Sequence, residues 1–299
     1  MSALLSLMMR QYHFGQAFDG VDWQSVSDVL MRIAGAWSSS NREDADALEA
    51  IEVSLCSLAA LTGERSASAL VEVSTWRSKV GRAGIRALGF NNSRRAHLQL
   101  AAVIAAERDI QRLDAAAHAL SRHGAIVVCE LLEASLLGTP AQVGISGHYA
   151  VMSLAMCSEE PLKHDTGVVI LTNPLLHDNA RVFIHSLPVV RGSVAPDEYT
   201  ILGMAHADHL VRVFAMARLC KTVSGEKAEE LLLPMLQDEV REVVVECLRE
   251  LEKVGGERTL ASLARVPPRG ARLERIVLRT ESAIRRRLEG GVNQETEER

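Results

Sequence analysis

Histidine and aspartate side chains gather in the middle of the chain, where their residue types could bind a metal ion. The chain has ten histidines, and all but the first lie between positions 97 and 209. The densest part of this cluster runs from His177-Asp178 to Asp208-His209 and includes His206. Zinc and iron bind such nitrogen and oxygen ligands where rigid elements bring them together. His177, His206 and His209 are therefore the candidate metal ligands, although capping or surface histidines are the favoured interpretation and no metal site is assigned.

One glycine-serine motif has the residue types of a hydrolase nucleophile. Gly144-Ile-Ser-Gly-His148 is similar to the Gly-x-Ser-x-Gly elbow, in which a strand leads into a sharp turn. Here the second glycine comes one residue too early, and His148 occupies its place. No clear strand is expected before the motif. We interpret it as a loop, and no catalytic residue is assigned.

Arginines form a basic cluster near the C-terminus. A basic face can bind the phosphates of nucleic acid or an acidic partner. Three glutamates interrupt this cluster, the tryptophans all lie in the N-terminal part of the chain, and the formal net charge is −5. These facts argue against a nucleic-acid partner and favour the polar outer face of a terminal helix. The arginines are Arg265, Arg269, Arg272, Arg275, Arg279, Arg285, Arg286 and Arg287.

A repeated Asp/Arg pattern reveals the elements that position these residues. Aspartates recur every 30 residues, each with an arginine three or four positions later, and each pair precedes an apolar run. Such a period indicates an array of structural repeats, and each repeat here is expected to contain two helices. An aspartate before a helix accepts backbone N–H bonds and complements the helix dipole. The pairs predicted to form a structural ladder are Asp178 and Arg181, Asp208 and Arg212, and Asp238 and Arg241.

The composition favours an all-α fold. Apolar residues make up 47% of the chain and aromatic residues only 4%, whereas sheet proteins are enriched in aromatic and β-branched residues. Two β-branched runs, 125–129 and 167–171, leave buried strands open as an alternative. The five cysteines are scattered and fit a reducing compartment. No apolar run is long enough to span a membrane, so we expect a cytoplasmic protein without membrane insertion.

The segment Leu231–Leu248, followed by Gly255–Leu260, resembles the HEAT-like repeat. It is most similar to the short variety, of roughly thirty residues, found in phycobilisome lyases and bacterial adaptor proteins. The resemblance covers residues 166–265 and, less closely, 75–157. It implies an α-solenoid of stacked helical hairpins, with the Asp/Arg pairs as an inter-repeat ladder. HEAT-like deoxyhypusine hydroxylase holds iron on repeated His-Glu pairs, and this chain contains no His-Glu pair.

The repeat pattern predicts four segments. Residues 1–63 form an N-terminal helical cap of degenerate repeats, and residues 64–265 form the HEAT-like array. Residues 266–291 form a C-terminal capping helix, and residues 292–299 form a disordered polar tail.

One column of the aligned second helices is the candidate for a partner-binding groove on the concave face, although packing between neighbouring repeats is the favoured interpretation. An apolar stripe in this position could receive a partner helix or peptide. The groove residues are Leu154, Ile184, His185, Met216, Val245 and Glu246.

These patterns lead to three hypotheses about function. The first is a non-enzymatic scaffold or adaptor that binds a protein partner through its concave face and needs no cofactor. The second follows from the resemblance: a lyase or chaperone that holds a tetrapyrrole or another cofactor. The third is a metal-dependent enzyme that uses the His/Asp cluster.

Overall fold

The computed structural model describes residues 23–38, 45–62, 64–266 and 270–297 of the 299-residue chain. Over these residues every regular element is a helix, so the described chain is all-α. The one pairing of extended backbone among them is an isolated parallel bridge between Ser193 and Val223. The chain divides into two compact units, which we call unit 1 (residues 1–165) and unit 2 (residues 166–299).

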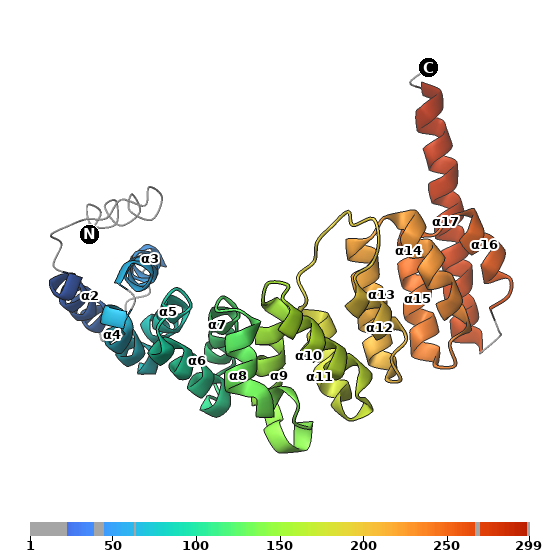
Figure 1. Ribbon diagram of the computed structural model, residues 1–299. Helices are drawn as coiled ribbons and strands as arrows, with labels where there is room; N and C mark the ends of the chain where they lie inside the picture. Colours follow the sequence, from blue (N-terminus) through green and yellow to red (C-terminus); the bar gives the residue numbers. More distant parts are fainter. Residues whose placement is uncertain (1–22, 39–44, 63, 267–269, 298–299) are drawn as a thin grey trace. The chain divides into compact units, whose positions relative to one another are not determined.

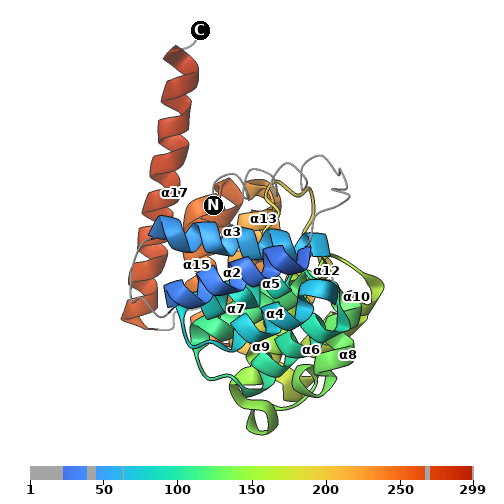
Figure 2. The same cartoon turned by 90° about the vertical axis from the view of Figure 1, so that its left-hand side faces the viewer.

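Unit 1 is built from successive helical hairpins (Figure 1). In each hairpin an even-numbered helix packs on the odd-numbered helix that follows it. The even-numbered helices α2, α4, α6 and α8 also pack on one another in succession, as do α3, α5, α7 and α9 (Figure 2). The helices are α2 (Trp23–Ser38), α3 (Ala45–Thr62), α4 (Glu64–Thr75), α5 (Lys79–Leu88), α6 (Arg94–Ala106), α7 (Ile110–Ser121), α8 (Ala125–Leu136) and α9 (Pro140–Met156).

Small residues and caps allow the close helix contacts of unit 1. Ser78 caps α5 by accepting a hydrogen bond from the Gly81 amide at 3.3 Å. A Cβ atom at Gly81 would lie 1.9 Å from the carbonyl oxygen of Trp76. A Cβ at Gly84 would lie 2.7 Å from Val73 in α4. Both positions therefore require glycine because no side chain fits between α5 and the end of α4.

Helix α10 (Pro161–Thr172) crosses the boundary between the units, and the rest of unit 2 follows it. The odd-numbered helices again pack in succession, α11 on α13, α13 on α15 and α15 on α17. The elements are η1 (Pro174–Leu176), α11 (His177–Ser186), α12 (Glu198–Met204), α13 (His209–Thr222), α14 (Gly225–Leu232), η2 (Leu233–Gln237), α15 (Arg241–Val254), α16 (Glu257–Leu263) and α17 (Ala271–Glu297).

The core of unit 2 lies between α13, α14, α15 and the start of α17. Its apolar side chains are inaccessible to solvent, as for Leu219, Val244 and Leu248. Burial of this kind contributes about 25 cal/mol per Å² of apolar surface removed from water. Phe183 packs edge-on against Tyr199 with ring centroids 5.2 Å apart, which extends the buried apolar region to α11 and α12.

The structure decides one alternative that the sequence left open. The β-branched runs 125–129 and 167–171 lie in α8 and α10, so the strand alternative is wrong. Helix α17 continues to Glu297 and so includes part of the predicted tail. The boundary between the two units lies within the predicted array of residues 64–265. None of the described helices has the length and apolar character that a membrane span requires.

Candidate functional site

The Asp/Arg pattern joins consecutive hairpins of unit 2. Arg181 in α11 donates to both carboxylate oxygens of Asp208, with Nε–Oδ1 3.0 Å and Nη2–Oδ2 2.5 Å. Arg212 in α13 donates in the same way to Asp238, with Nε–Oδ2 2.9 Å and Nη2–Oδ1 3.0 Å. Each arginine therefore reaches forward to the loop before the next odd-numbered helix.

The same aspartates hold the helix starts. Asp208 is the N-cap of α13 and accepts hydrogen bonds from the amides of Leu210 and Val211 at 2.9 and 3.2 Å. Burial would raise the pKa of Asp208, but the bonds from Arg181 and from the α13 backbone lower it to about 2. A carboxylate that stays charged and uses both oxygens in this way has a structural role rather than that of a proton acceptor.

The two end members of the predicted ladder differ from the middle ones. Asp178 bonds Arg181 within its own helix at 2.9 Å. Arg241 is exposed and forms no hydrogen bond or ion pair with another side chain in the described ranges. The forward pairing thus joins α11 to α13 and α13 to α15.

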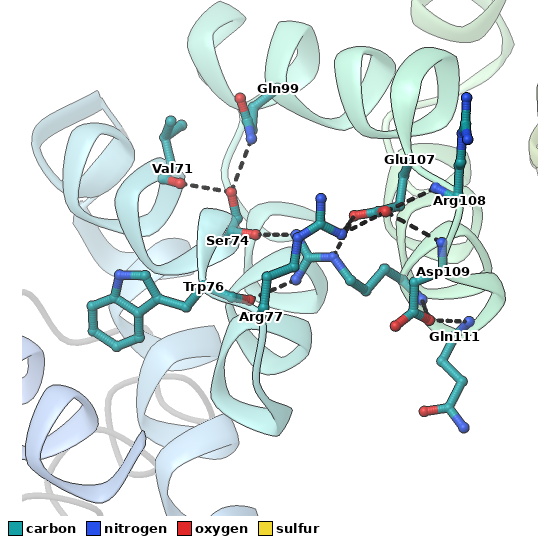
Figure 3. Close-up of polar contacts among 10 residues, drawn as sticks. Val71, Ser74, Trp76, Arg77, Gln99, Glu107, Arg108, Asp109 and Gln111 are labelled. Atoms are coloured by element: carbon teal, nitrogen blue, oxygen red, sulfur yellow. Dashed lines mark hydrogen bonds and ion pairs between the residues drawn. The ribbon is translucent and has the colours of Figure 1, made fainter. Parts of the chain in front are cut away.

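Unit 1 contains a junction of different design around Arg112 (Figure 3). Arg112 is 5% exposed, and its guanidinium donates to the carbonyls of Trp76 (2.7 Å) and Ser74 (2.6 Å) and to Glu107 (2.6 Å). Glu107 also pairs with Arg77. Burial would raise the pKa of Glu107, but its hydrogen bonds to Arg77, to the Arg108 amide and to Arg112 lower it to about 2. Arg112 thereby fixes the loop between the two helices of the preceding hairpin, α4 and α5.

Most of the residues predicted to line the partner-binding groove are buried and line no groove. Leu154 and Met216 are 0% exposed and Ile184 is 1% exposed, so these side chains belong to the core. Val245 is half-buried against the core of unit 2. The packing alternative holds for this column because odd-numbered helices contact neighbours on both sides.

The two polar members of the column lie nearer the surface. His185 is exposed and contacts the Phe214 ring with centroids 5.5 Å apart. Glu246 pairs with Arg249 at 3.0 Å. Neither side chain extends an apolar groove.

The candidate metal ligands do not converge. In the described parts of the chain, no three His, Cys, Asp or Glu side chains are placed to hold a metal ion. His206 accepts the Asp208 amide through Nδ1 at 2.9 Å. Burial lowers the pKa of His206. His177 lies 3.7 Å from the carboxylate of Asp178.

The glycine-serine motif lies at a break in a helix. Gly144 has φ 55° and ψ −140° and interrupts α9. Helix α8 precedes this segment, so the strand that leads into a nucleophile elbow is replaced by a helix.

A cleft in unit 1 combines apolar and charged lining residues. Its volume is about 590 Å³, and we call it the α3–α5 cleft. One face of α3 supplies most of its wall, because these residues recur at helical spacing. The lining residues are Ala45, Leu48, Glu49, Glu52, Val53, Cys56, Ser57, Arg86, Phe90 and Arg122.

The charged groups of the cleft are unequally paired. Arg86 on α5 donates to Glu52 on α3 at 2.6 Å. The Arg122 guanidinium lies 4.1 Å from the centroid of the Phe90 ring, a favourable cation–π distance. It forms no ion pair with the described acidic side chains. Burial raises the pKa of the Cys56 thiol to about 12, so this cysteine is neutral and a poor nucleophile.

The cleft therefore has the groups for binding and lacks an activated nucleophile. Leu48, Val53 and Phe90 provide apolar surface, and Arg122 provides a cation without a carboxylate partner among the described residues. The spacing of the α3 residues is visible in the sequence. This spacing marks a cleft wall only together with Phe90 and Arg122. These two residues come next to α3 only through the packing of α5 and α7.

A comparison with protein-family models finds no match for this chain, and a comparison with curated proteins finds none either.

Proposed function

We propose that the protein is a HEAT-like α-solenoid scaffold that binds a segment of a partner protein in the α3–α5 cleft. The observation that carries this proposal is the cleft itself, which combines an apolar wall with an unneutralised arginine. Stacked helical hairpins and the Asp/Arg ladder support the solenoid assignment. The Asp208 and Asp238 carboxylates bind arginines of the preceding hairpin, which favours a structural role for them over metal chemistry.

The apolar wall would receive one large side chain of the partner. Leu48 and Val53 come from one face of α3, and Phe90 lies opposite them after α5. Anchoring of an aromatic or aliphatic side chain in such a pocket commonly dominates the energy of a protein interface. The charged rim around it would exclude water and set the orientation.

The charges define the chemistry of the partner segment. Glu52 and Arg86 neutralise each other across the cleft. Glu49 adds a second carboxylate to the lining, and Arg122 has no carboxylate partner among the described residues. We infer a segment with an apolar anchor and a neighbouring Asp or Glu. Arg122 would bind this carboxylate in a charge-assisted hydrogen bond.

A displayed library of short peptides, selected against the purified protein, tests this proposal. We expect enriched peptides to combine an apolar anchor with a nearby carboxylate. Val53→Glu and Arg122→Glu should weaken their binding by roughly tenfold or more, because each removes a contact worth about 1.5–3 kcal/mol. Arg122 is exposed, so its substitution leaves the core intact.

Val194→Glu is the matched control. Val194 is 91% exposed and lies in unit 2, outside the cleft. Peptides that bind the cleft variants as tightly as the natural protein, or that lose binding in Val194→Glu alone, would show that the partner site lies elsewhere.

A cofactor-holding role is the second candidate, because the cleft volume lies in the range of small-molecule sites. Visible absorbance of the protein purified from its native cells distinguishes the two. A stoichiometric chromophore that Val53→Glu removes would favour the cofactor role.

A further inference from the structure

Four arginines surround a hollow between α15 and α17 in unit 2. The hollow has a volume of about 390 Å³ and is lined by Arg249, Arg272, Arg275, Ile276 and Arg279. We call it the arginine hollow. The hollow shares no lining residue with the α3–α5 cleft. The inference drawn from it does not depend on the function proposed for that cleft.

The walls of the hollow are fixed to each other. Thr280 in α17 donates to the carbonyl of Leu248 in α15 at 3.4 Å. Arg287 donates to the carbonyls of Glu252 (2.6 Å) and Lys253 (2.9 Å) at the end of α15, and also to that of Gly255. These bonds satisfy carbonyls that a helix C-terminus leaves without partners. The helix positions that carry the four arginines are therefore fixed relative to one another.

Two of the four arginines have acidic partners and two do not. Arg249 pairs with Glu246 at 3.0 Å, and Arg279 pairs with Glu252 at 2.9 Å. Arg275 donates only to the carbonyl of Ala271 in its own helix, at 3.3 Å. Arg272 has no carboxylate partner in the described ranges. The hollow thus carries an excess of two positive charges.

This excess matches one phosphate monoester. Such a group carries a charge of about −1.5 to −2 at pH 7 and three acceptor oxygens. Guanidinium groups present planar forks of donors that bind phosphate oxygens in pairs. Arg272 and Arg275 are one helical turn apart on α17, so both forks can reach the same small anion.

The surroundings favour a phosphorylated side chain over the other sources of phosphate. An extended nucleic-acid strand would meet Glu246 and Glu252 beside the hollow and a chain of net charge −5. The side chains of Arg249 and Arg279 are 57% and 69% exposed, so a free metabolite would be poorly enclosed. A protein segment that lies on the surface can place one phosphate group between the arginines and an apolar neighbour on Ile276.

We propose that the arginine hollow binds a phosphorylated serine or threonine side chain of a partner protein. The direct test uses a short fluorescent peptide with one phosphoserine among neutral residues, together with its unphosphorylated twin. The phosphopeptide should bind at least roughly tenfold more tightly than the twin. The double variant Arg272→Glu/Arg275→Glu should abolish this difference, and millimolar inorganic phosphate should compete.

The control variant is Arg286→Glu, which removes the same kind of charge from an exposed position of α17 outside the hollow. It should bind the phosphopeptide like the natural protein. Three results would overturn the proposal: equal binding of the two peptides, unchanged phosphopeptide binding by the double variant, or binding of a DNA duplex in preference to the phosphopeptide. If Val53→Glu and Arg122→Glu do not weaken the binding of peptides selected for the α3–α5 cleft, the phosphopeptide test of the arginine hollow is unaffected.

Discussion

At the scale of single residues, buried arginines and carboxylates hold the helix ends and loops of both units. Asp208 and Asp238 each accept two hydrogen bonds from an arginine of the preceding hairpin. Arg112 binds two backbone carbonyls and a carboxylate in unit 1. These groups satisfy polar atoms that would otherwise be costly to bury.

Asp208→Ala removes both the cap of α13 and the partner of Arg181. We expect the free energy of unfolding of unit 2 to fall by roughly 1–3 kcal/mol. Denaturant unfolding and the hydrogen exchange of α13 amides measure this effect. Asp178→Ala is the control because its carboxylate bonds Arg181 only within α11. Equal effects of the two substitutions would contradict the ladder.

His123 makes unit 1 sensitive to acid. Burial, together with His97 and Arg122 nearby, lowers the pKa of His123 from 6.5 to about 4. Between these values the unfolded chain binds more protons than the folded chain, so stability falls as the pH is lowered from 6.5 towards 4. His123→Gln, whose amide can still donate to the Leu88 carbonyl, should reduce this loss in urea titrations at several pH values. An unchanged pH dependence in His123→Gln would show that His123 is not the group that responds to acid.

The sequence predicts the residue-scale ladder better than the binding site. Aspartates and arginines at a fixed period can be recognised because each has a local capping role. The sequence left both a groove and a buried position open for Ile184 and Met216, because their burial depends on how far the neighbouring helices cover them. A helical residue beside the main apolar stripe is buried where a neighbouring helix covers it and exposed where none does.

At the scale of elements, close contacts between helices decide which residues are tolerated. Gly81→Ala would place a Cβ atom 1.9 Å from the Trp76 carbonyl. We expect it to destabilise unit 1 by roughly 1–3 kcal/mol or more, because the backbone must move. Thermal unfolding measures the change.

Gly35→Ala is the matched control in α2. Its Cβ would meet only Trp76 at 3.8 Å, an ordinary contact. Alanine is the better helix former by about 1 kcal/mol, so this variant should be as stable as the natural protein or more so. Destabilisation of the same size by both substitutions would contradict the packing of α5 against α4.

A single carboxylate also joins elements that are distant in sequence. Glu229 in α14 accepts hydrogen bonds from the amides of Gly256 and Thr259 (2.6 and 3.0 Å) and from the Thr259 hydroxyl (2.7 Å). It thereby caps α16 from outside that helix. Burial would raise the pKa of Glu229, but these bonds lower it. No local motif marks Glu229, which explains why sequence patterns do not reveal it.

The sequence predicts most helices because each hairpin keeps its apolar period. The β-branched runs of α8 and α10 are ambiguous by themselves, since short apolar runs suit buried strands and buried helices equally. Packing resolves the ambiguity: Val128 and Ile170 are fully buried in helices. The extent of α17 beyond residue 291 was not predicted because glycines and polar residues there are typical of a helix end.

At the scale of the whole molecule, each of the two compact units carries one of the two proposed binding surfaces. The α3–α5 cleft in unit 1 is mainly apolar, and its Arg122 has no carboxylate partner among the described residues. The arginine hollow in unit 2 has an excess of positive charge. A scaffold with surfaces of different chemistry can recognise two features of a partner and gain affinity from their linkage. The division between the units was not predicted because the repeat pattern continues across it.

Hydrogen exchange of the full-length protein, with and without a peptide selected for binding, tests the central claim most directly. The account predicts slower exchange of amides in α3, in α5 and at the end of α7, with loss of this protection in Arg122→Glu. Protection confined to unit 2, or unchanged protection in Arg122→Glu, would contradict the assignment of the α3–α5 cleft as the partner-binding site.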